Sequence, residues 1–235
     1  MAKNIYLIGG CKGGVGKSLV AMSVLDYLEG QGEKFLLIET DTSNPDVWKT
    51  YHKDATNKDS SGADPGLIDL DVAEGWIELV NLCDANPDSS IVINTGARND
   101  KGISAYGETL CNTLAELKRK LVTLWVINRH RDSLELLQDY MDAIPNANVH
   151  VIRNGYFSEE KKFEFYNNSN LRKSIEARGG KSLTFPDLAD RVSDDIYINR
   201  MRISVACKEL PIGNRAELVR WRNAVKSVLE GVIHE

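Results

Sequence analysis

Short apolar runs alternate along this chain with longer amphipathic stretches. The run "NIYLIGG" at residues 4–10 is followed by "GKSLVAMSVLDYLEGQG" at 16–32, which predicts a helix closed by Gly30 and Gly32. Further apolar runs predict strands at 34–40, 90–95, 121–128 and 148–154. Between these runs, helical patterns cover residues 72–83, 104–120, 131–144 and 159–178.

Strands that are apolar throughout, with helices between them, are typical of a parallel sheet covered on both faces. The predicted fold class is therefore α/β, a doubly wound and mostly parallel sheet flanked by helices. One domain is expected over 1–235, interrupted by a polar insertion at about 42–66. A stretch of this length without apolar periodicity predicts either a solvated insertion or a functional loop.

The last helical pattern, at 215–233, has two chemically different sides. Its apolar stripe is formed by Leu218, Trp221, Val225, Val228 or Leu229, and Val232, which indicates a core-facing helix. Its cations are Arg215, Arg220, Arg222 and Lys226. They predict either a solvated face or a local contact with nucleic acid.

Composition and net charge exclude only a few classes of function. The net charge is −5 and charged residues make up 27% of the chain, so the molecule as a whole is not attracted to nucleic acid or anionic lipid. The four cysteines are scattered without metal-ligand or redox spacing, which indicates a reduced, cytoplasmic protein. Neither a signal peptide nor a membrane span is predicted.

The stretch "GGCKGGVGKS" at 9–18 carries the clearest chemistry. It follows a predicted strand and opens a predicted helix, which is the context of a phosphate-binding loop. Glycines let backbone N–H groups face inward, and these groups together with the helix N-terminus attract phosphates. Lys17 adds a full positive charge, and the Ser18 hydroxyl is a candidate Mg²⁺ ligand. The predicted nucleotide contacts are Gly13, Gly14, Val15, Gly16, Lys17, Ser18 and Leu19.

Two residues depart from the general phosphate-loop pattern. Cys11 stands where the pattern has its first glycine, and its expected role is to fill space. Lys12 is a second lysine, at the front of the loop. With Lys12, the stretch "KGGVGKS" resembles the deviant Walker A motif of the MinD/ParA ATPases. That resemblance implies that Lys12 contacts the nucleotide of a partner subunit, so that ATP binding and homodimerisation form one event; the alternative is a solvent-exposed lysine.

The resemblance also assigns roles to the ends of two strands. Asp41, in "FLLIETD" at 35–41, matches the acid that orients the attacking water and lies near the metal, whereas Glu39 is expected either to be structural or to support the metal-binding residues from behind. Asn94, in "SIVINTGAR", stands where the family normally has an aspartate that holds a water on Mg²⁺. Because an amide brings no charge, slow or partner-dependent hydrolysis is expected. Residues 42–47 and 96–102 then correspond to the two switch loops.

The site for the base is predicted from weaker signals. Asn154, in "VIRNG", resembles the asparagine that reads the adenine edge in this family, and its alternative role is to form a turn before Gly155. Pro186 and Asp187, in "LTFPDLA", resemble the loop that closes over the base. An ATPase that uses ATP and Mg²⁺ is therefore the predicted activity.

Three longer stretches narrow the resemblance. "ETDTSNPDVWKTY", "VINRHRDSLELLQDY" and "RNGYFSEEKKFEFY" look most like the small ATPases of plasmid stability and conjugal-transfer operons. This implies plasmid partition, stability or conjugal DNA transfer, with DNA or a DNA-binding protein of the operon as partner. Two alternatives share the scaffold: a metabolic ATP-dependent ligase or synthetase, and a MinD-like membrane-positioning ATPase. The ending "VLEGVIHE" lacks the basic amphipathic tail that the latter needs.

Overall fold

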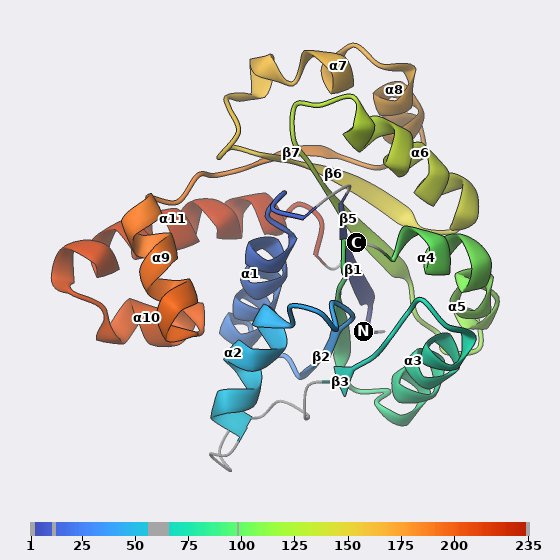
Figure 1. Cartoon of the computed structure of the whole chain (residues 1–235), viewed down its shortest axis with the longest axis horizontal. Coiled ribbons are helices and arrows are strands. Elements are labelled where there is room, and N and C mark those ends of the chain that lie inside the picture. The colour runs from blue at the N-terminus through green and yellow to red at the C-terminus, as the bar shows by residue number, and fades with distance from the viewer. Residues whose placement is uncertain (1–2, 11–12, 56–65, 98, 234–235) are drawn as a thin grey trace.

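The core of the molecule is a single seven-stranded sheet in which every strand pairs in parallel with its neighbours. The computed structural model describes residues 3–10, 13–55, 66–97 and 99–233. The strand order is β3-β2-β4-β1-β5-β6-β7 (Figure 1). The strands are β1 (Ile5–Gly10), β2 (Phe35–Glu39), β3 (Gly66–Leu67), β4 (Ser90–Asn94), β5 (Leu121–Ile127), β6 (Asn148–Asn154) and β7 (Ser182–Phe185).

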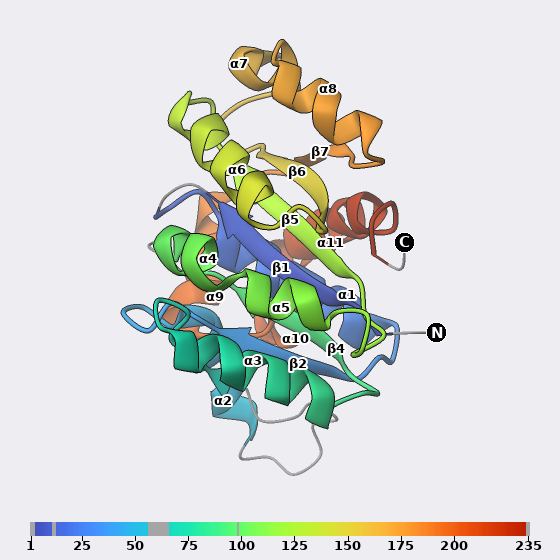
Figure 2. The ribbon, with the colours of Figure 1, turned by 90° about the vertical axis from the view of Figure 1, so that its right-hand side faces the viewer.

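Helices cover both faces of the sheet, which explains why its strands are apolar throughout (Figures 1 and 2). Along β1, Ile5 and Leu7 belong to one core, whereas Tyr6 and Ile8 belong to the core of the opposite face. The face of Tyr6 and Ile8 packs against α1 (Lys17–Gly30), α2 (Asp46–Ala55), α9 (Asp190–Asn199), α10 (Ile203–Glu209) and α11 (Ile212–Leu229). The other face packs against α3 (Ala73–Ala85), α4 (Asp100–Tyr106), α5 (Glu108–Thr113), α6 (Asp132–Ala143), α7 (Glu164–Asn167) and α8 (Asn170–Ala177).

The predicted fold class is confirmed, and the five predicted strands agree with observed ones within a residue at either end. The prediction of a loop throughout 42–66 is wrong over 46–55, where the chain forms α2. Val47 and Tyr51 lie four residues apart, on the same side of the helix, and both are buried in the core that also contains α1 residues. These two contacts pack the helix against the core although most of the stretch is polar. Residues 56–65 lie outside the described part of the chain.

Two predicted helices are broken in the structure. The stretch 104–120 contains only the end of α4, which begins at Asp100, followed by α5, which ends at Thr113. The two helices are separated at Gly107, where a Cβ would lie 2.4 Å from the Cδ1 atom of Ile144 on the chain following α6. The stretch 159–178 forms a 3₁₀ turn, η1 (Glu160–Lys162), then α7 and α8. The Ser169 side chain accepts a hydrogen bond from the backbone N–H of Arg172 and so begins α8 as a separate helix. The structure also contains β3, β7, α9 and α10, which the sequence analysis did not predict.

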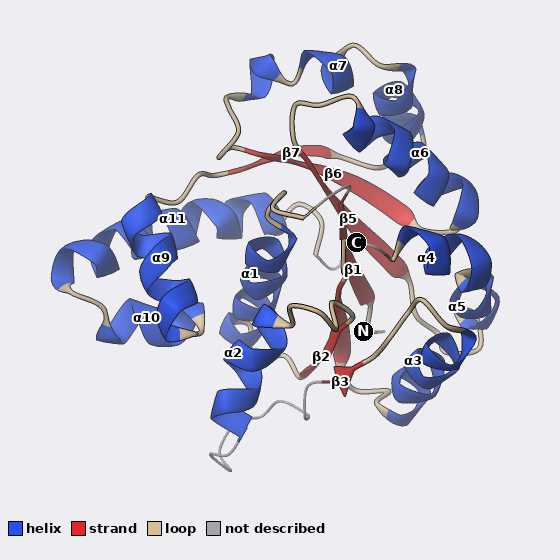
Figure 3. Ribbon diagram, in the orientation of Figure 1, coloured by secondary structure: helices blue, strands red, loops and turns tan. Residues whose placement is uncertain are grey.

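The topology brings particular loops together at the carboxyl edge of the sheet. Because β1 lies between β4 and β5, with β2 beyond β4, the loops that follow β1, β2 and β4 leave the sheet side by side (Figure 3). In open α/β sheets this edge is where ligands bind. Among the helices of the described residues, none is long and apolar enough to cross a membrane.

Candidate functional site

The loop between β1 and α1 has the backbone of a phosphate cradle. Gly14 and Gly16 have φ angles of 78° and 101°, a left-handed conformation that glycine adopts without strain. Gly16 caps α1, whose first turn contains no acidic residue and receives no side-chain cap among the described residues. The amide N–H groups of this helix end are therefore left for an anion. The predicted residues Cys11 and Lys12 lie outside the described part of the chain.

Lys17 opens α1 and is buried, with only 7% of its surface exposed. Its stem packs closely on the end of β1, since a Cβ on Gly10 would lie 3.2 Å from the Lys17 Cγ atom. Burial raises the pKa of Asp100, at the start of α4, and the positive charge of Lys17 opposes that rise. The charge of Lys17 therefore acts on the start of α4. Ser18 and Leu19 follow it in the first turn and are half-buried.

Asn99 joins the loops that follow β2, β3 and β4, and the sequence analysis did not single it out. Its Oδ1 atom accepts hydrogen bonds from the Thr40 hydroxyl at 2.6 Å and from the Gly96 N–H at 2.7 Å. Its Nδ2 atom donates to Asp71 at 3.1 Å. One buried side chain thus ties the predicted switch loop at 96–102 to the segments of the chain that leave β2 and β3. The only sequence signal was its place within the predicted switch stretch 96–102.

Asp41 organises the loop after β2. Its Oδ1 atom accepts a hydrogen bond of 2.9 Å from the backbone N–H of Asn44, and its own N–H donates to Glu39 at 3.1 Å. The carboxylate that was predicted to orient a water therefore lies at the carboxyl edge of the sheet, in a turn of defined geometry. Its catalytic role stays a prediction.

Glu39 and Asn94 are register partners at the ends of β2 and β4. Both are buried, and the Asn94 Nδ2 atom lies 3.0 and 3.1 Å from the two carboxylate oxygens of Glu39. Burial raises the pKa of Glu39 to about 7, against the hydrogen bonds from Asp41 and Asn94 that lower it. Glu39 therefore contacts Asp41 and Asn94, two of the three residues that were assigned to the metal, and its role there stays a prediction.

Asn154 connects β6 to the phosphate loop. Its Nδ2 atom donates a hydrogen bond of 2.9 Å to the Val15 carbonyl, and its Oδ1 atom accepts one of 3.1 Å from the Tyr156 N–H. The second contact is the turn that the sequence left open as an alternative. A Cβ on Gly16 would lie 2.4 Å from the Asn154 Nδ2 atom, so this approach requires glycine. Recognition of adenine by Asn154 stays a prediction.

A pocket of about 180 Å³ unites most of the residues predicted to hold the nucleotide. The predicted residues in its wall are Gly14, Gly16, Leu19, Asn154, Pro186 and Asp187. The Trp221 side chain on α11 holds one wall, because its Nε1 atom donates a hydrogen bond of 2.8 Å to the Pro186 carbonyl. Trp221 was predicted to face the core, but its contact with this loop was not predicted.

Comparison with known sequences agrees with this arrangement. A family model described as the CobQ/CobB/MinD/ParA nucleotide binding domain (CbiA) matches residues 6–162. The chain belongs to this family. A curated relative, Protein MobD from Acidithiobacillus ferrooxidans, is 72% identical over 235 residues and is covered in full, as is this chain.

Solved structures of the same fold include one with bound ATP. MinD from Aquifex aeolicus superimposes with a TM-score of 0.53 at 13% identity, covering 95% of this chain and 97% of its own. A variant of McdA from Cyanothece, solved in complex with ATP, also gives a TM-score of 0.53 at 13% identity, covering 97% of this chain and 96% of that chain. At this level of identity, the comparison shows the family fold.

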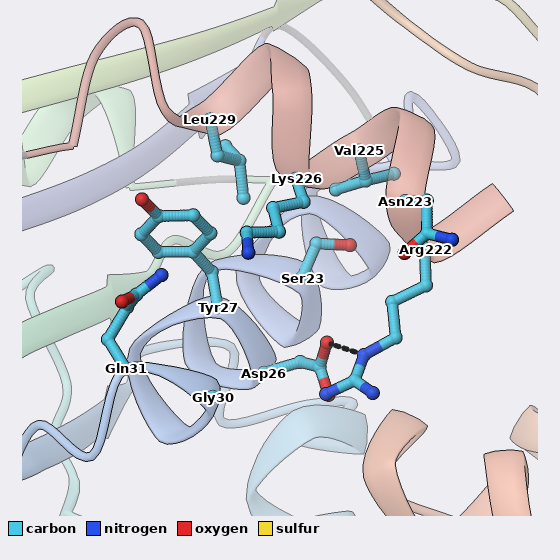
Figure 4. A pocket seen from close by; sticks show the side chains of 10 residues that line it. All are labelled: Ser23, Asp26, Tyr27, Gly30, Gln31, Arg222, Asn223, Val225, Lys226 and Leu229. Carbon is cyan, nitrogen blue, oxygen red and sulfur yellow. Dashed lines mark hydrogen bonds and ion pairs between the residues drawn. The ribbon is translucent and has the colours of Figure 1, made fainter. Parts of the chain in front are cut away.

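A second hollow, of about 260 Å³, lies between α1 and α11 and contains none of the residues predicted to bind the nucleotide. Figure 4 shows Arg222 extending from α11 to Asp26 on α1, where its Nε atom lies 2.6 Å from a carboxylate oxygen, and Lys226 lies beside Tyr27. Arg220 forms a bidentate pair with Glu217 on its own helix. The cations of the final helix therefore do not form one unpaired basic face, because these two arginines are each paired with an acid.

Proposed function

We propose that this family member binds ATP with Mg²⁺ and hydrolyses it as a homodimeric switch in plasmid mobilisation or conjugal DNA transfer. The observation that carries the proposal is the single pocket in which the phosphate loop, Asn154 and the Pro186–Asp187 loop meet. Nucleotide binding is the family's described property, and a protein of the same fold has been solved with ATP. The name of the relative MobD supports the mobilisation context.

Each part of the site has a chemical task under this proposal. Lys17 and the amides of Gly13, Gly14, Val15 and Gly16 neutralise the phosphates, and Ser18 supplies a hydroxyl ligand to Mg²⁺. Asp41 orients the attacking water, and Asn154, Pro186 and Asp187 enclose the base. The bound metal would offset the charge that develops on the transferred phosphoryl group.

The donor set fits Mg²⁺ better than a metal that needs an all-protein cage. No group of three His, Cys, Asp or Glu side chains able to hold a metal occurs among the described residues. Mg²⁺ keeps several waters and takes few protein ligands besides the phosphates, so Ser18, Asp41 and Asn94 suffice. The buried Oδ1 atom of Asn94, which has no hydrogen-bond partner among the described residues, is an acceptor suited to a metal-bound water.

The partner that the arrangement favours is a DNA-binding protein rather than DNA itself. The candidate DNA-contacting arginines of α11 include Arg222, paired with Asp26, and Arg220, paired with Glu217. A cation already paired with a carboxylate releases fewer counterions when it meets a phosphate, so it adds less to DNA affinity. The pairing of these arginines therefore favours a protein partner, through which this chain would reach the transferred DNA.

Lys12→Ala is expected to abolish ATP-dependent dimerisation while leaving nucleotide binding by the monomer within about threefold of wild type. The reason is that the second lysine of the deviant motif acts on the partner's phosphates, where a cation offsets developing charge. The measurement is size-exclusion chromatography with light scattering, without nucleotide and with ATP or a non-hydrolysable analogue.

Lys34→Ala is the matched control, because it removes an exposed lysine at the amino end of β2, away from the loop. It should dimerise like the parent. A Lys12→Ala protein that still dimerises with ATP would remove the cross-subunit role and, with it, the dimeric switch. Loss of nucleotide binding by the monomer would instead place Lys12 in its own subunit's site.

A further inference from the structure

The ends of β2 and β4 hold an amide and a carboxylate in direct contact. Glu39 is 0% exposed and Asn94 is 2% exposed, and they face each other across the register of the two strands. The groups that act on the Glu39 carboxylate among the described residues are the N–H groups of Asp41 and Trp48, the Asn94 amide and the Asp41 carboxylate. None of these groups is a cation. A buried carboxylate held only by neutral donors is costly unless a positive charge comes near.

This contact fixes the orientation of the Asn94 amide. The Asn94 Nδ2 atom donates to both Glu39 oxygens, at 3.0 and 3.1 Å. The amide oxygen must then face away from Glu39. It is buried and has no hydrogen-bond partner among the described residues. Native proteins rarely leave such an acceptor unsatisfied, which points to a bound group.

The position of this acceptor indicates which kind of group it receives. Asn94 pairs with Ile8 across β1, two residues before the strand runs into the phosphate loop. The neighbouring Thr95 hydroxyl donates to the Ile8 carbonyl at 2.8 Å. The buried Asn94 oxygen is an acceptor with no partner among the described residues, and it suits a donor such as a water on a divalent cation.

We propose that Glu39 supplies the negative charge that Asn94 lacks, so that the two residues together do the work of one aspartate toward hydrated Mg²⁺. The Asn94 oxygen accepts from a metal-bound water, and the Glu39 carboxylate, one hydrogen bond behind it, polarises the amide and balances the metal's charge. Glu39 is thus a positioning residue. The inference rests on the proposed binding of Mg²⁺ and ATP.

This arrangement also changes what Asn94→Asp should do. From the sequence alone, that substitution is expected to strengthen Mg²⁺ binding, because it restores an acid. In the structure, Asn94→Asp places a second carboxylate against Glu39 and removes the Asn94 amide N–H groups that donate to it. Two carboxylates in contact oppose each other's ionisation, so the added acid does not simply add a negative charge. The double exchange, Glu39→Gln together with Asn94→Asp, is instead expected to preserve Mg²⁺ binding, because it moves the carboxylate from β2 to β4 and the amide from β4 to β2.

The test is the gain in ATP affinity that Mg²⁺ provides, measured with a fluorescent ATP analogue in Mg²⁺ and in EDTA. Glu39→Gln keeps the size of the side chain and should lower this gain about tenfold or more, the range found for groups that support metal ligands. Affinity in EDTA should stay within about threefold of wild type. The double exchange should recover most of the gain, whereas Asn94→Asp alone should not.

The outcomes separate this inference from the proposed function. Wild-type protein that fails to bind ATP both in Mg²⁺ and in EDTA would remove the proposed function itself. Wild-type protein that binds ATP, with Glu39→Gln keeping the full Mg²⁺ gain, would overturn the role of Glu39. Equal losses in Mg²⁺ and in EDTA, or a double exchange no better than Glu39→Gln, would show that the contact only supports the fold. Thermal unfolding of each variant confirms that the folded protein is compared.

Discussion

Lys17→Met is expected to lower ATP affinity by at least about 100-fold. Lys17 is the side-chain cation in the described part of the phosphate loop, and a contact between a charged donor and phosphate oxygens is worth roughly 1.5–3 kcal/mol. Two such contacts are worth about 3–6 kcal/mol, and each 1.4 kcal/mol is a factor of ten in affinity. Isothermal titration calorimetry with ATP, in Mg²⁺ and in EDTA, measures the loss.

Methionine is a better replacement than alanine at this position. The Lys17 stem is buried against the end of β1, and methionine keeps most of that volume while it removes the charge. Lys17→Ala adds a cavity, so it serves as the second variant and should lose affinity to a similar degree. Lys101→Ala, on the exposed side of α4, removes a lysine from the neighbouring loop and should bind ATP like wild type. Unchanged affinity in Lys17→Met would exclude the phosphate loop from nucleotide binding.

The apolar runs predicted the sheet well because nearly every strand is buried on both faces. In β4, for example, residues 91–93 are all inaccessible, so the polar residues of this strand, Ser90 and Asn94, stand only at its two ends. The helix α2 was missed for the opposite reason, because Val47 and Tyr51 are its buried contacts within a polar stretch. Local periodicity detects an element only when several of its positions are buried.

Parts of the candidate site were predictable from motifs, and the contacts between them were not. The glycines and Lys17 are recognisable because the phosphate loop is one continuous stretch. The hydrogen bond between Asn94 and Glu39 joins residues 55 positions apart, and that between Asn154 and Val15 joins residues 139 positions apart. Only the strand order places such residues together, so their partners and their pKa values follow from the fold rather than from the sequence.

The final helix shows how a surface pattern can conceal a structural contact. Arg220 and Arg222 looked equivalent in the sequence, as cations on the side away from the apolar stripe. In the structure their hydrogen bonds to carboxylates are equally short, at 2.6 Å, but their surroundings differ. The Arg222 and Asp26 side chains are 35% and 7% exposed, whereas those of Arg220 and Glu217 are 65% and 28% exposed.

Arg222→Ala is therefore expected to lower the free energy of unfolding by about 2 kcal/mol, and Arg220→Ala to leave it close to the wild-type value. Removing one partner of a fully buried ion pair costs about 3–5 kcal/mol, and partial exposure of Arg222 reduces that figure. Urea denaturation of the two variants, which differ by two positions on one helix, measures the difference. Similar stabilities for the two variants would show that the contact between α1 and α11 does not depend on this pair.

The pH dependence of the stability lost in Arg222→Ala shows whether charge or packing causes the loss. Burial already raises the pKa of Asp26, and Arg222 opposes that rise, so removal of Arg222 raises the pKa further. A carboxyl whose pKa is higher in the folded state loses stability as pH increases through that folded-state value. The deficit should therefore be larger at pH 8 than at pH 5, and Asp26→Asn in the Arg222→Ala background should make it nearly independent of pH. A loss of stability that stays constant with pH would instead show that packing of the arginine stem, rather than its charge, stabilises the contact between α1 and α11.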